Sequence, residues 1–371
     1  RKILVVVQFT VSIILIIATI AVQEQIKHSK NRPIGYEKSE LVIIGKNTED
    51  YEGKYNQLRS ELINNRAIVE MAESSSPLTD VWSSSGGFEW EGKDPNFLTN
   101  IVNLSITHDF GKTIGWEIVE GRDFSRDFST DSTAFILNET AVKYMGLEKP
   151  LGKIVRWNNE KHEIIGIVKD MLMESPFESV KPTIFLIKYD NTNWIELKLN
   201  PDKSATASLA LIKEVFNKHV PNIPFEYQFV DRKFAKKFIA EERIRKLSGI
   251  FAFLAVFISC LGLFGLASYI AEQRTKEIGV RKVLGATVLN LWKLLSKDFV
   301  KLVILSCFIA IPLAYYGVVN LLLNNYEYHT EIVWWIYVLV GVGALGITLL
   351  TVSFQAIKAA SANPVKSLKT E

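Results

Sequence analysis

Four stretches of this 371-residue chain are long, apolar and nearly free of charge, and they constrain its fold more than any other feature. They are residues 1–22, 247–271, 299–323 and 332–357. About twenty apolar residues in a helix are enough to cross the hydrocarbon core of a bilayer. A buried helix of a water-soluble protein rarely stays uncharged over such a length. The sequence therefore predicts four transmembrane helices.

Lysine and arginine gather beside the same ends of these stretches. Arg1 and Lys2 begin the first one, and Lys358, Lys366 and Lys369 follow the last. The loop at residues 272–298 adds Arg274, Lys276, Arg281, Lys282, Lys293 and Lys297. Short loops rich in Lys and Arg stay on the cytoplasmic side of a membrane. The loop is therefore expected in the cytoplasm, and residues 23–246 outside it.

The long outer segment alternates strand-like and helix-like patterns. Strands are expected at residues 41–44, 163–168, 183–187, 194–199 and 225–230, and helices at 55–65 and 204–219. This order is typical of an α+β module. The expected fold class is an α-helical membrane protein of four transmembrane helices, with a large α+β extracytoplasmic domain inserted between helices 1 and 2.

The cytoplasmic loop carries signals for two short helices. Gly285 is placed to end a first helix, and Thr287 to cap the start of a second. In the second helix, four apolar residues recur at the spacing of one helix face. They are Val288, Leu291, Trp292 and Leu295. The loop is therefore expected to present a defined surface to the cytoplasm.

The ten residues from Glu277 to Ala286 read EIGVRKVLGA. This segment resembles the signature of the MacB/FtsX-type ABC transporter permeases. In that family it lies between the second and third spans and forms a coupling helix that docks on a separate ATPase subunit. The resemblance implies six candidate coupling residues: Glu277, Gly279, Arg281, Lys282, Gly285 and Ala286. The plainer alternative is a basic loop that only fixes the orientation of the chain.

The outer segment resembles the periplasmic core domain of the same family in four phrases. They are GWEIVEGRDF at 115–124, LNETAV at 137–142, PLGK at 150–153 and IGIVKD at 165–170. The resemblance implies a two-lobed MacB-like core domain at residues 23–246 and an FtsX-like permease domain at residues 247–371. The chain also resembles the C-terminal four-span unit of eight-span permeases from Bacteroidetes-type bacteria, in which Arg1 and Lys2 would continue a preceding linker.

Motifs for catalysis or cofactor binding are not visible. Residues 111–113 read GKT, but a phosphate-binding loop needs glycine at position 106, where this chain has Ile106. The five histidines are scattered without metal-ligand spacing. The net charge of +3 gives no argument for nucleic acid. We therefore expect no enzyme activity in the chain itself, no cofactor and no metal site.

The leading hypothesis is a permease subunit of an ABC transporter in the bacterial inner membrane, which couples ATP hydrolysis by a partner to movement of its periplasmic domain. Export, efflux and lipoprotein release are all known in the family. The resemblance implies an ABC ATPase, a second permease unit (as a homodimer or a pseudo-dimer within a longer chain) and a periplasmic adaptor as partners. One alternative is an FtsX-like regulator that relays ATPase state to a cell-wall hydrolase.

A membrane-bound periplasmic sensor is an alternative from another class, since a span, an outer domain and a second span also build receptors. It predicts a signalling module directly after the second span. Here two further apolar stretches, 299–323 and 332–357, follow instead. The sequence therefore favours the permease.

The predicted orientation can be tested by cysteine labelling, after Cys260 and Cys307 are replaced by serine. Ser129→Cys should react with a membrane-impermeant maleimide in intact spheroplasts, because it lies in the predicted outer domain. Asn290→Cys should react only after the membrane is permeabilised. The reverse labelling pattern would contradict the topology and the cytoplasmic position of the loop.

Overall fold

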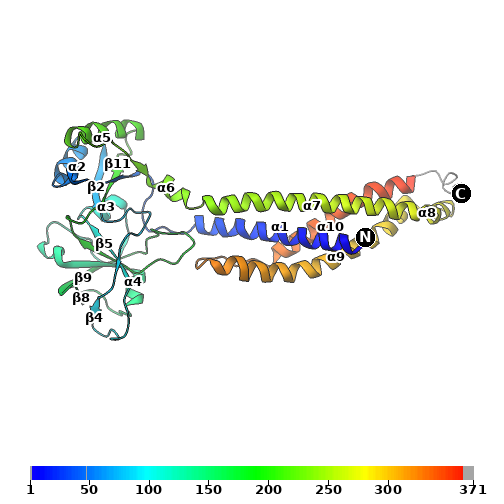
Figure 1. The fold of residues 1–371 in the computed structure, drawn as a ribbon, viewed down its shortest axis with the longest axis horizontal. Helices are drawn as coiled ribbons and strands as arrows, with labels where there is room; N and C mark the ends of the chain where they lie inside the picture. Colours follow the sequence, from blue (N-terminus) through cyan, green and yellow to red (C-terminus); the bar gives the residue numbers. More distant parts are fainter. Residues whose placement is uncertain (1, 47, 362–371) are drawn as a thin grey trace. The chain divides into compact units, whose positions relative to one another are not determined.

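The computed structural model describes residues 2–46 and 48–361, which form two compact units (Figure 1). The membrane unit contains residues 2–31 and 239–361, and the outer unit is Arg32–Phe238. Lys366 and Lys369, predicted to follow the last span, lie outside the described residues.

The membrane unit is built from four long helices and a short one. They are α1 (Lys2–Lys30), α7 (Ile239–Gln273), α8 (Thr275–Val283), α9 (Val288–Gly317) and α10 (Trp335–Ser361). A π-helical turn, η3 (Val318–Leu322), and a 3-10 turn, η4 (Leu323–Asn325), follow α9. Four of these segments have the length and hydropathy of membrane spans, which confirms the predicted fold class.

Helices α1 and α7 extend beyond their apolar stretches into polar sequence. Residues 23–30 and 239–246 were expected in the outer domain, but the structure places them in these two helices. Once a helix exists, each added residue gains a hydrogen bond at little further cost, so polar residues continue it readily. The compact outer unit is correspondingly shorter than the predicted 23–246.

The pairing of α1 with α7 is antiparallel and close. The hydroxyls of Ser12 and Ser259 lie 3.0 Å apart. A Cβ atom added to Gly262 would lie 2.6 Å from Oε1 of Gln8, so a larger residue there would displace the end of the Gln8 side chain. At the outer ends, Lys30 Nζ lies 2.5 Å from Glu242 Oε1. Small residues thus bring the two backbones together, as expected where lipid offers no hydrophobic driving force between helices.

Polar side chains also tie α1 to other parts of the membrane unit. Ser306 Oγ of α9 lies 3.2 Å from the carbonyl oxygen of Val6 and 2.9 Å from that of Leu302 in its own helix. Gln25 Nε2 donates to the carbonyl oxygen of Tyr328 at 2.7 Å, and Gln25 Oε1 accepts from the Thr330 amide at 2.9 Å. Gln25 is buried, and these bonds hold the loop between α9 and α10 against α1.

The described strands of the outer unit form one twelve-stranded sheet (Figure 1). The strands are β1 (Leu41–Gly45), β2 (Ile68–Ser74), β3 (Ser84–Ser85), β4 (Glu89–Trp90), β5 (Ile101–Ile106), β6 (Ile118–Gly121), β7 (Ala134–Asn138), β8 (Ile154–Trp157), β9 (Glu160–Val168), β10 (Thr183–Ile187), β11 (Trp194–Leu199) and β12 (Gln228–Phe229). Their order is β12-β1-β11-β2-β5-β10-β7-β9-β8-β4, with β3 beside β5 and β6 beside β9. The described strands therefore form a continuous sheet across the outer unit.

Short helices cover this sheet. They are α2 (Tyr55–Asn64), α3 (Phe110–Ile114), α4 (Glu139–Tyr144), α5 (Ala205–His219) and α6 (Val230–Lys236), with 3-10 turns η1 (Glu49–Tyr51) and η2 (Ser129–Thr133). Helices α2 and α5 pack on β1, β11 and β2, and α4 packs on β7 and β10. Each end of the sheet therefore has its own hydrophobic cluster.

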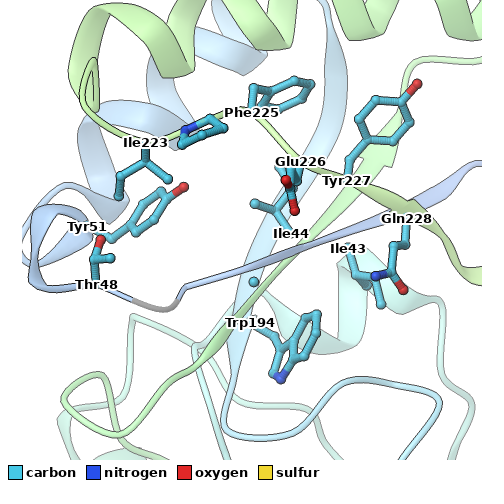
Figure 2. A pocket seen from close by; sticks show the side chains of 12 residues that line it. Ile43, Ile44, Thr48, Tyr51, Trp194, Ile223, Phe225, Glu226, Tyr227 and Gln228 are labelled. Carbon is cyan, nitrogen blue, oxygen red and sulfur yellow. The ribbon is translucent and has the colours of Figure 1, made fainter.

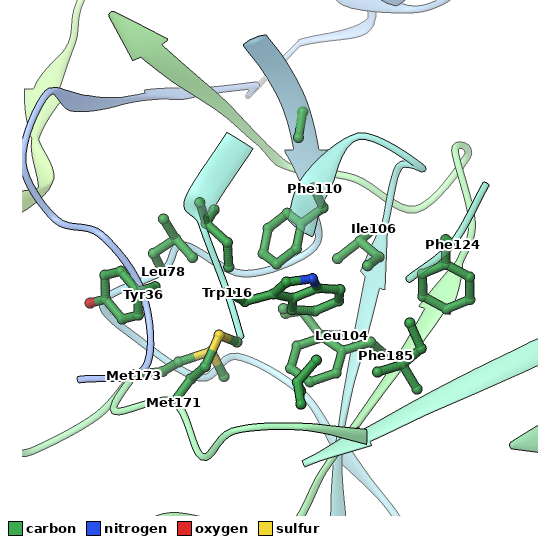
Figure 3. Close-up of a cluster of buried hydrophobic side chains, with 14 of the residues drawn as sticks. Tyr36, Leu78, Leu104, Ile106, Phe110, Trp116, Phe124, Met171, Met173 and Phe185 are labelled. Atoms are coloured by element: carbon green, nitrogen blue, oxygen red, sulfur yellow. The ribbon is translucent and has the colours of Figure 1, made fainter. Parts of the chain in front are cut away.

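A third cluster surrounds Trp116 (Figure 3). Its ring centroid lies 5.1 Å from that of Phe185 and 5.7 Å from that of Phe110, both edge-to-face. A Cβ atom at Gly111 would lie 2.1 Å from Trp116 Nε1, so this glycine is needed for ring packing. Gly111 and Thr113 of the GKT triplet are therefore buried in the core around α3, and Lys112 is exposed.

Most predicted elements of the outer unit are present, but the last strand is much shorter than predicted. Only Gln228 and Phe229 of the predicted strand 225–230 pair with β1, and Val230 already begins α6. The rings of Phe225, Tyr227 and Phe229 do lie next to one another, with centroids 5.5 and 5.7 Å apart. The alternation indicates extended backbone there, but it does not report pairing with a neighbouring strand.

Two glutamates are buried on neighbouring strands. Glu73 on β2 accepts a bond from Lys46 Nζ at 3.0 Å. Glu196 on β11 has no exposed surface, and its Oε1 lies 2.5 Å from Ser74 Oγ, which itself lies 2.6 Å from the carbonyl oxygen of Ser76. One hydroxyl proton cannot serve both oxygens, so a proton on Glu196 completes the pair. Burial, with a smaller contribution from the charge of Glu73, raises the pKa of Glu196 to about 8.

This raised pKa predicts that the free energy of unfolding of the domain falls as the pH rises from 4.5 to about 8. The folded domain keeps a proton that the unfolded chain releases above the ordinary pKa of 4.5. The stabilisation is therefore complete below pH 4.5 and is lost as the pH rises through about 8, by at most about 1.4 kcal/mol per pH unit. Glu196→Gln should resemble the parent at pH 5 and melt at a higher temperature at pH 9.

Tryptophan fluorescence during thermal unfolding of the full chain would measure this difference. Glu214→Gln, on the exposed face of α5, is the matched control and should follow the parent at both pH values. Equal losses of melting temperature between pH 5 and pH 9 in the parent and in Glu196→Gln would contradict a protonated Glu196.

Candidate functional site at the α8–α9 turn

Helix α8 follows α7 after a one-residue break in the helical geometry at Arg274. This residue has φ −95° and ψ 11°, outside the helical range, although its amide still bonds the carbonyl oxygen of Ile270. Its guanidinium donates to Asp298 of α9, with Nη2 3.1 Å from Oδ2. The ion pair fixes the point at which the chain leaves α7 relative to α9.

Helix α8 ends in a Schellman motif. Gly285 has φ +92°, a conformation that favours glycine. Its amide bonds the carbonyl oxygen of Lys282 at 3.1 Å, and the Ala286 amide bonds that of Arg281 at 2.9 Å. Thr287 then caps α9, because its hydroxyl accepts from the Asn290 amide at 3.3 Å. Both predicted helix boundaries in this loop are confirmed.

The turn is held together by a small apolar core. Ile278 of α8 packs with Leu291 and Leu295 of α9, and all three are buried. Trp292 packs at the edge of this core, and its Nε1 donates to Ser353 Oγ of α10 at 2.8 Å. Val288 of the same stripe is 45% exposed, so the buried part of the stripe begins at Leu291. Helices α8 and α9 therefore form one packed corner.

Large apolar side chains remain exposed at the tip of this corner. Leu284 is 81% exposed and Val283 is 66% exposed, and both directly precede Gly285. They are joined by Val280 and Leu289, which are about half exposed. Together these side chains form an apolar surface at the tip of the corner.

A charged pair lies beside this tip. Arg281 Nη2 lies 2.7 Å from Glu277 Oε1, one helical turn earlier on α8, and both side chains are about half exposed. Each residue therefore has a partner of opposite charge within the same helix.

Family comparisons account for nearly the whole chain. Residues 3–215 match the MacB-like periplasmic core domain, and residues 249–364 match the FtsX-like permease C-terminal domain. The chain belongs to the MacB/FtsX-type permease family. With its four apolar helices, this permease is a multi-pass inner-membrane protein whose inserted α+β domain lies in the periplasm.

Individual relatives of the permease are distant. It is 25% identical over 228 residues to the macrolide export ATP-binding/permease protein MacB of Aggregatibacter actinomycetemcomitans, covering 57% of this chain and 33% of that protein. It is 24% identical over 269 residues to the uncharacterized ABC transporter permease YknZ of Bacillus subtilis (strain 168), covering 69% of this chain and 66% of that protein. The permease thus spans about a third of the first relative and about two thirds of the second.

A solved structure is similar to the outer domain of the permease. The periplasmic region of MacB from Actinobacillus actinomycetemcomitans aligns with a TM-score of 0.39 and 17% identity, over 58% of this chain and 96% of that chain.

The six candidate coupling residues of the permease fall on α8 and the turn that follows it. Glu277 and Arg281 pair with each other, Gly279 is buried, and Lys282, Gly285 and Ala286 lie at the helix end. Sequence reasoning did not single out Val283 and Leu284, whose exposure is the strongest feature of the turn. Their position just before a predicted helix-ending glycine was the available signal.

The Schellman motif can be tested by substitution at Gly285. An added Cβ atom would meet no other atom within 4 Å, so the penalty is conformational rather than a clash. Gly285→Val should cost about 1–2 kcal/mol and let the end of α8 fray. Gly285→Asn, which tolerates positive φ, should cost less. Faster hydrogen exchange at the Ala286 amide in the valine variant alone is the expected result, and equal exchange in both variants would contradict a left-handed cap.

Proposed function

We propose that this chain is the permease subunit of an ABC transporter and that its α8–α9 turn docks on a separate ABC ATPase. ATP-driven closure of the ATPase would move the turn, and the spans would pass this movement to the periplasmic domain. That domain would act on a periplasmic or envelope substrate in export, efflux or lipoprotein release. The observation that carries the proposal is the exposed apolar tip at Val283 and Leu284 on a capped helix end.

The exposed tip supports a protein partner for a physical reason. Burying apolar surface yields about 25 cal/mol per Å², and one well-packed side chain in a pocket often dominates an interface. Leu284 is presented by a helix whose end is fixed by two backbone hydrogen bonds. A preorganised contact of this kind loses little conformational entropy on docking.

Force applied to the turn would reach the spans through two contacts. The Arg274–Asp298 ion pair joins the start of α8 to α9, and the Ile278–Leu291–Leu295 core joins its middle. Docking on α8 would therefore displace α7 and α9 together. This is the mechanical role proposed for the predicted coupling residues.

The relatives support the same assignment. The name of one includes ATP-binding together with permease, and that of another is ABC transporter permease. We extend this to the present chain as a need for an ABC ATPase subunit. A second permease unit, as a homodimer or within a longer chain, and a periplasmic adaptor are further partners in the proposal.

The proposal is tested by placing a charge on the apolar tip. Leu284→Glu should insert in the membrane normally but reduce co-purification with the cognate ATPase by at least about tenfold, because the interface would have to bury an unpaired carboxylate. Leu98→Glu is the matched control: Leu98 is 90% exposed on the outer domain, and its variant should keep the ATPase.

A charge exchange separates helix stability from docking. In Glu277→Arg combined with Arg281→Glu, the ion pair within α8 is retained but its direction is reversed. Loss of ATPase stimulation in this double variant, with α8 intact by hydrogen exchange, would indicate that the partner reads these charges. Full ATPase assembly and stimulation in both the Leu284→Glu and the exchange variants would leave the turn as an orientation signal only.

A further inference from the structure

The first strand of the outer sheet is only partly covered at its open edge. On that side β12 pairs with Val42 and Ile43 alone. The Lys46 amide bonds the carbonyl oxygen of Asn193, so Lys46 directs its backbone groups toward β11. Backbone groups of successive strand residues alternate in direction. Gly45 therefore directs its N–H and C=O groups to the opposite side, where β12 has already ended.

A cavity of about 580 Å³ opens at this uncovered edge (Figure 2). Gly45 and Ile44 line it together with the departing segment at residues 223–228. Tyr51 and Trp194 line it from opposite faces of the sheet, since Tyr51 packs in the cluster with Ile44 and Trp194 in the cluster with Ile43. A second cavity of about 560 Å³ adjoins it, because Thr48 lines both. The open edge thus continues into a groove rather than into a flat surface.

The lining of the two cavities is acidic. Glu226 lines the first, and Glu49, Glu52 and Asp190 line the second; all four are exposed. Within residues 2–46 and 48–361, none of these carboxylates lies in an ion pair. The basic side chain in the lining, Lys46, is already paired with Glu73 at 3.0 Å. The groove therefore carries uncompensated negative charge.

We propose that this edge binds an extended polypeptide segment with basic side chains, which adds as a strand beside β1. A donor and an acceptor on Gly45 would bond the backbone of the guest, as in other strand-addition complexes. Side chains of a strand alternate in direction, so lysine or arginine would reach the carboxylates while their apolar neighbours, on the other face of the guest strand, contact one of the two aromatic rings. The charge of the groove disfavours an anionic guest.

The test uses the full chain in nanodiscs of neutral phosphatidylcholine, so that lipid charge does not attract the probe. A fluorescent hexapeptide of alternating lysine and valine should bind saturably, and more weakly as salt rises. The same peptide with glutamate in place of lysine should bind at least about tenfold more weakly. A lysine–valine peptide N-methylated at alternate residues should also lose binding, because it cannot donate to the strand edge.

Matched variants locate the binding at this edge. Glu226→Lys should weaken the peptide by at least about tenfold, whereas Glu148→Lys, an equally exposed position away from the groove, should not. Unchanged tryptophan fluorescence would show that both variants are folded. Equal binding by the two variants, or by the N-methylated and parent peptides, would overturn the proposal. Neither result depends on ATPase docking, so the outcome is independent of the coupling role of the α8–α9 turn.

Discussion

Backbone N–H and C=O groups inside a bilayer must form their hydrogen bonds within the protein. This requirement restricts the four apolar stretches of this chain to helices. Small residues lie at the contact between α1 and α7: Gly262 faces Gln8, and Ser12 bonds Ser259. Because α1 and α7 run antiparallel in this register, Lys30 meets Glu242. The chain therefore leaves and re-enters the membrane unit at adjacent helix ends, and an insertion of more than two hundred residues is accommodated without disturbing the helix pair.

Elements with a long periodic pattern were predicted correctly from the sequence. Features that depend on contact with a neighbouring strand or helix were not. The spans, the helix at 204–219 and the strands at 183–187 and 194–199 each follow from local periodicity. The strand at 225–230 is shorter than predicted because alternation indicates only extended backbone, whereas β1 pairs with no described residue of this segment other than Gln228 and Phe229. The apolar stripe of α9 is likewise buried only where α8 packs over it, so Leu291 and Leu295 are covered and Val288 is not. In both cases the outcome depends on a neighbouring element that local periodicity does not report.

The candidate site shows the same division. Gly285 and Thr287 were identifiable because caps depend on local backbone conformation. Exposure of Val283 and Leu284 was not, since an apolar pair in a loop can be buried or exposed with equal ease until the packing of α8 is known. The open edge at Gly45 was also not foreseeable, because it exists only through the early end of β12. Both proposals, ATPase docking and peptide binding, therefore rest on surfaces that the tertiary structure leaves uncovered.

The two helices that leave the α8–α9 turn differ in their ability to transmit force. Helix α7 is continuous over 35 residues, about 52 Å at 1.5 Å per residue. Helix α9 contains Pro312 and passes into the π-helical turn η3, and each interrupts the regular hydrogen-bond ladder. Displacement of the turn would therefore be absorbed in part near the outer end of α9 but carried along α7. In the proposed coupling role, α7 is therefore the stiffer of these two helices along which movement of the turn would pass.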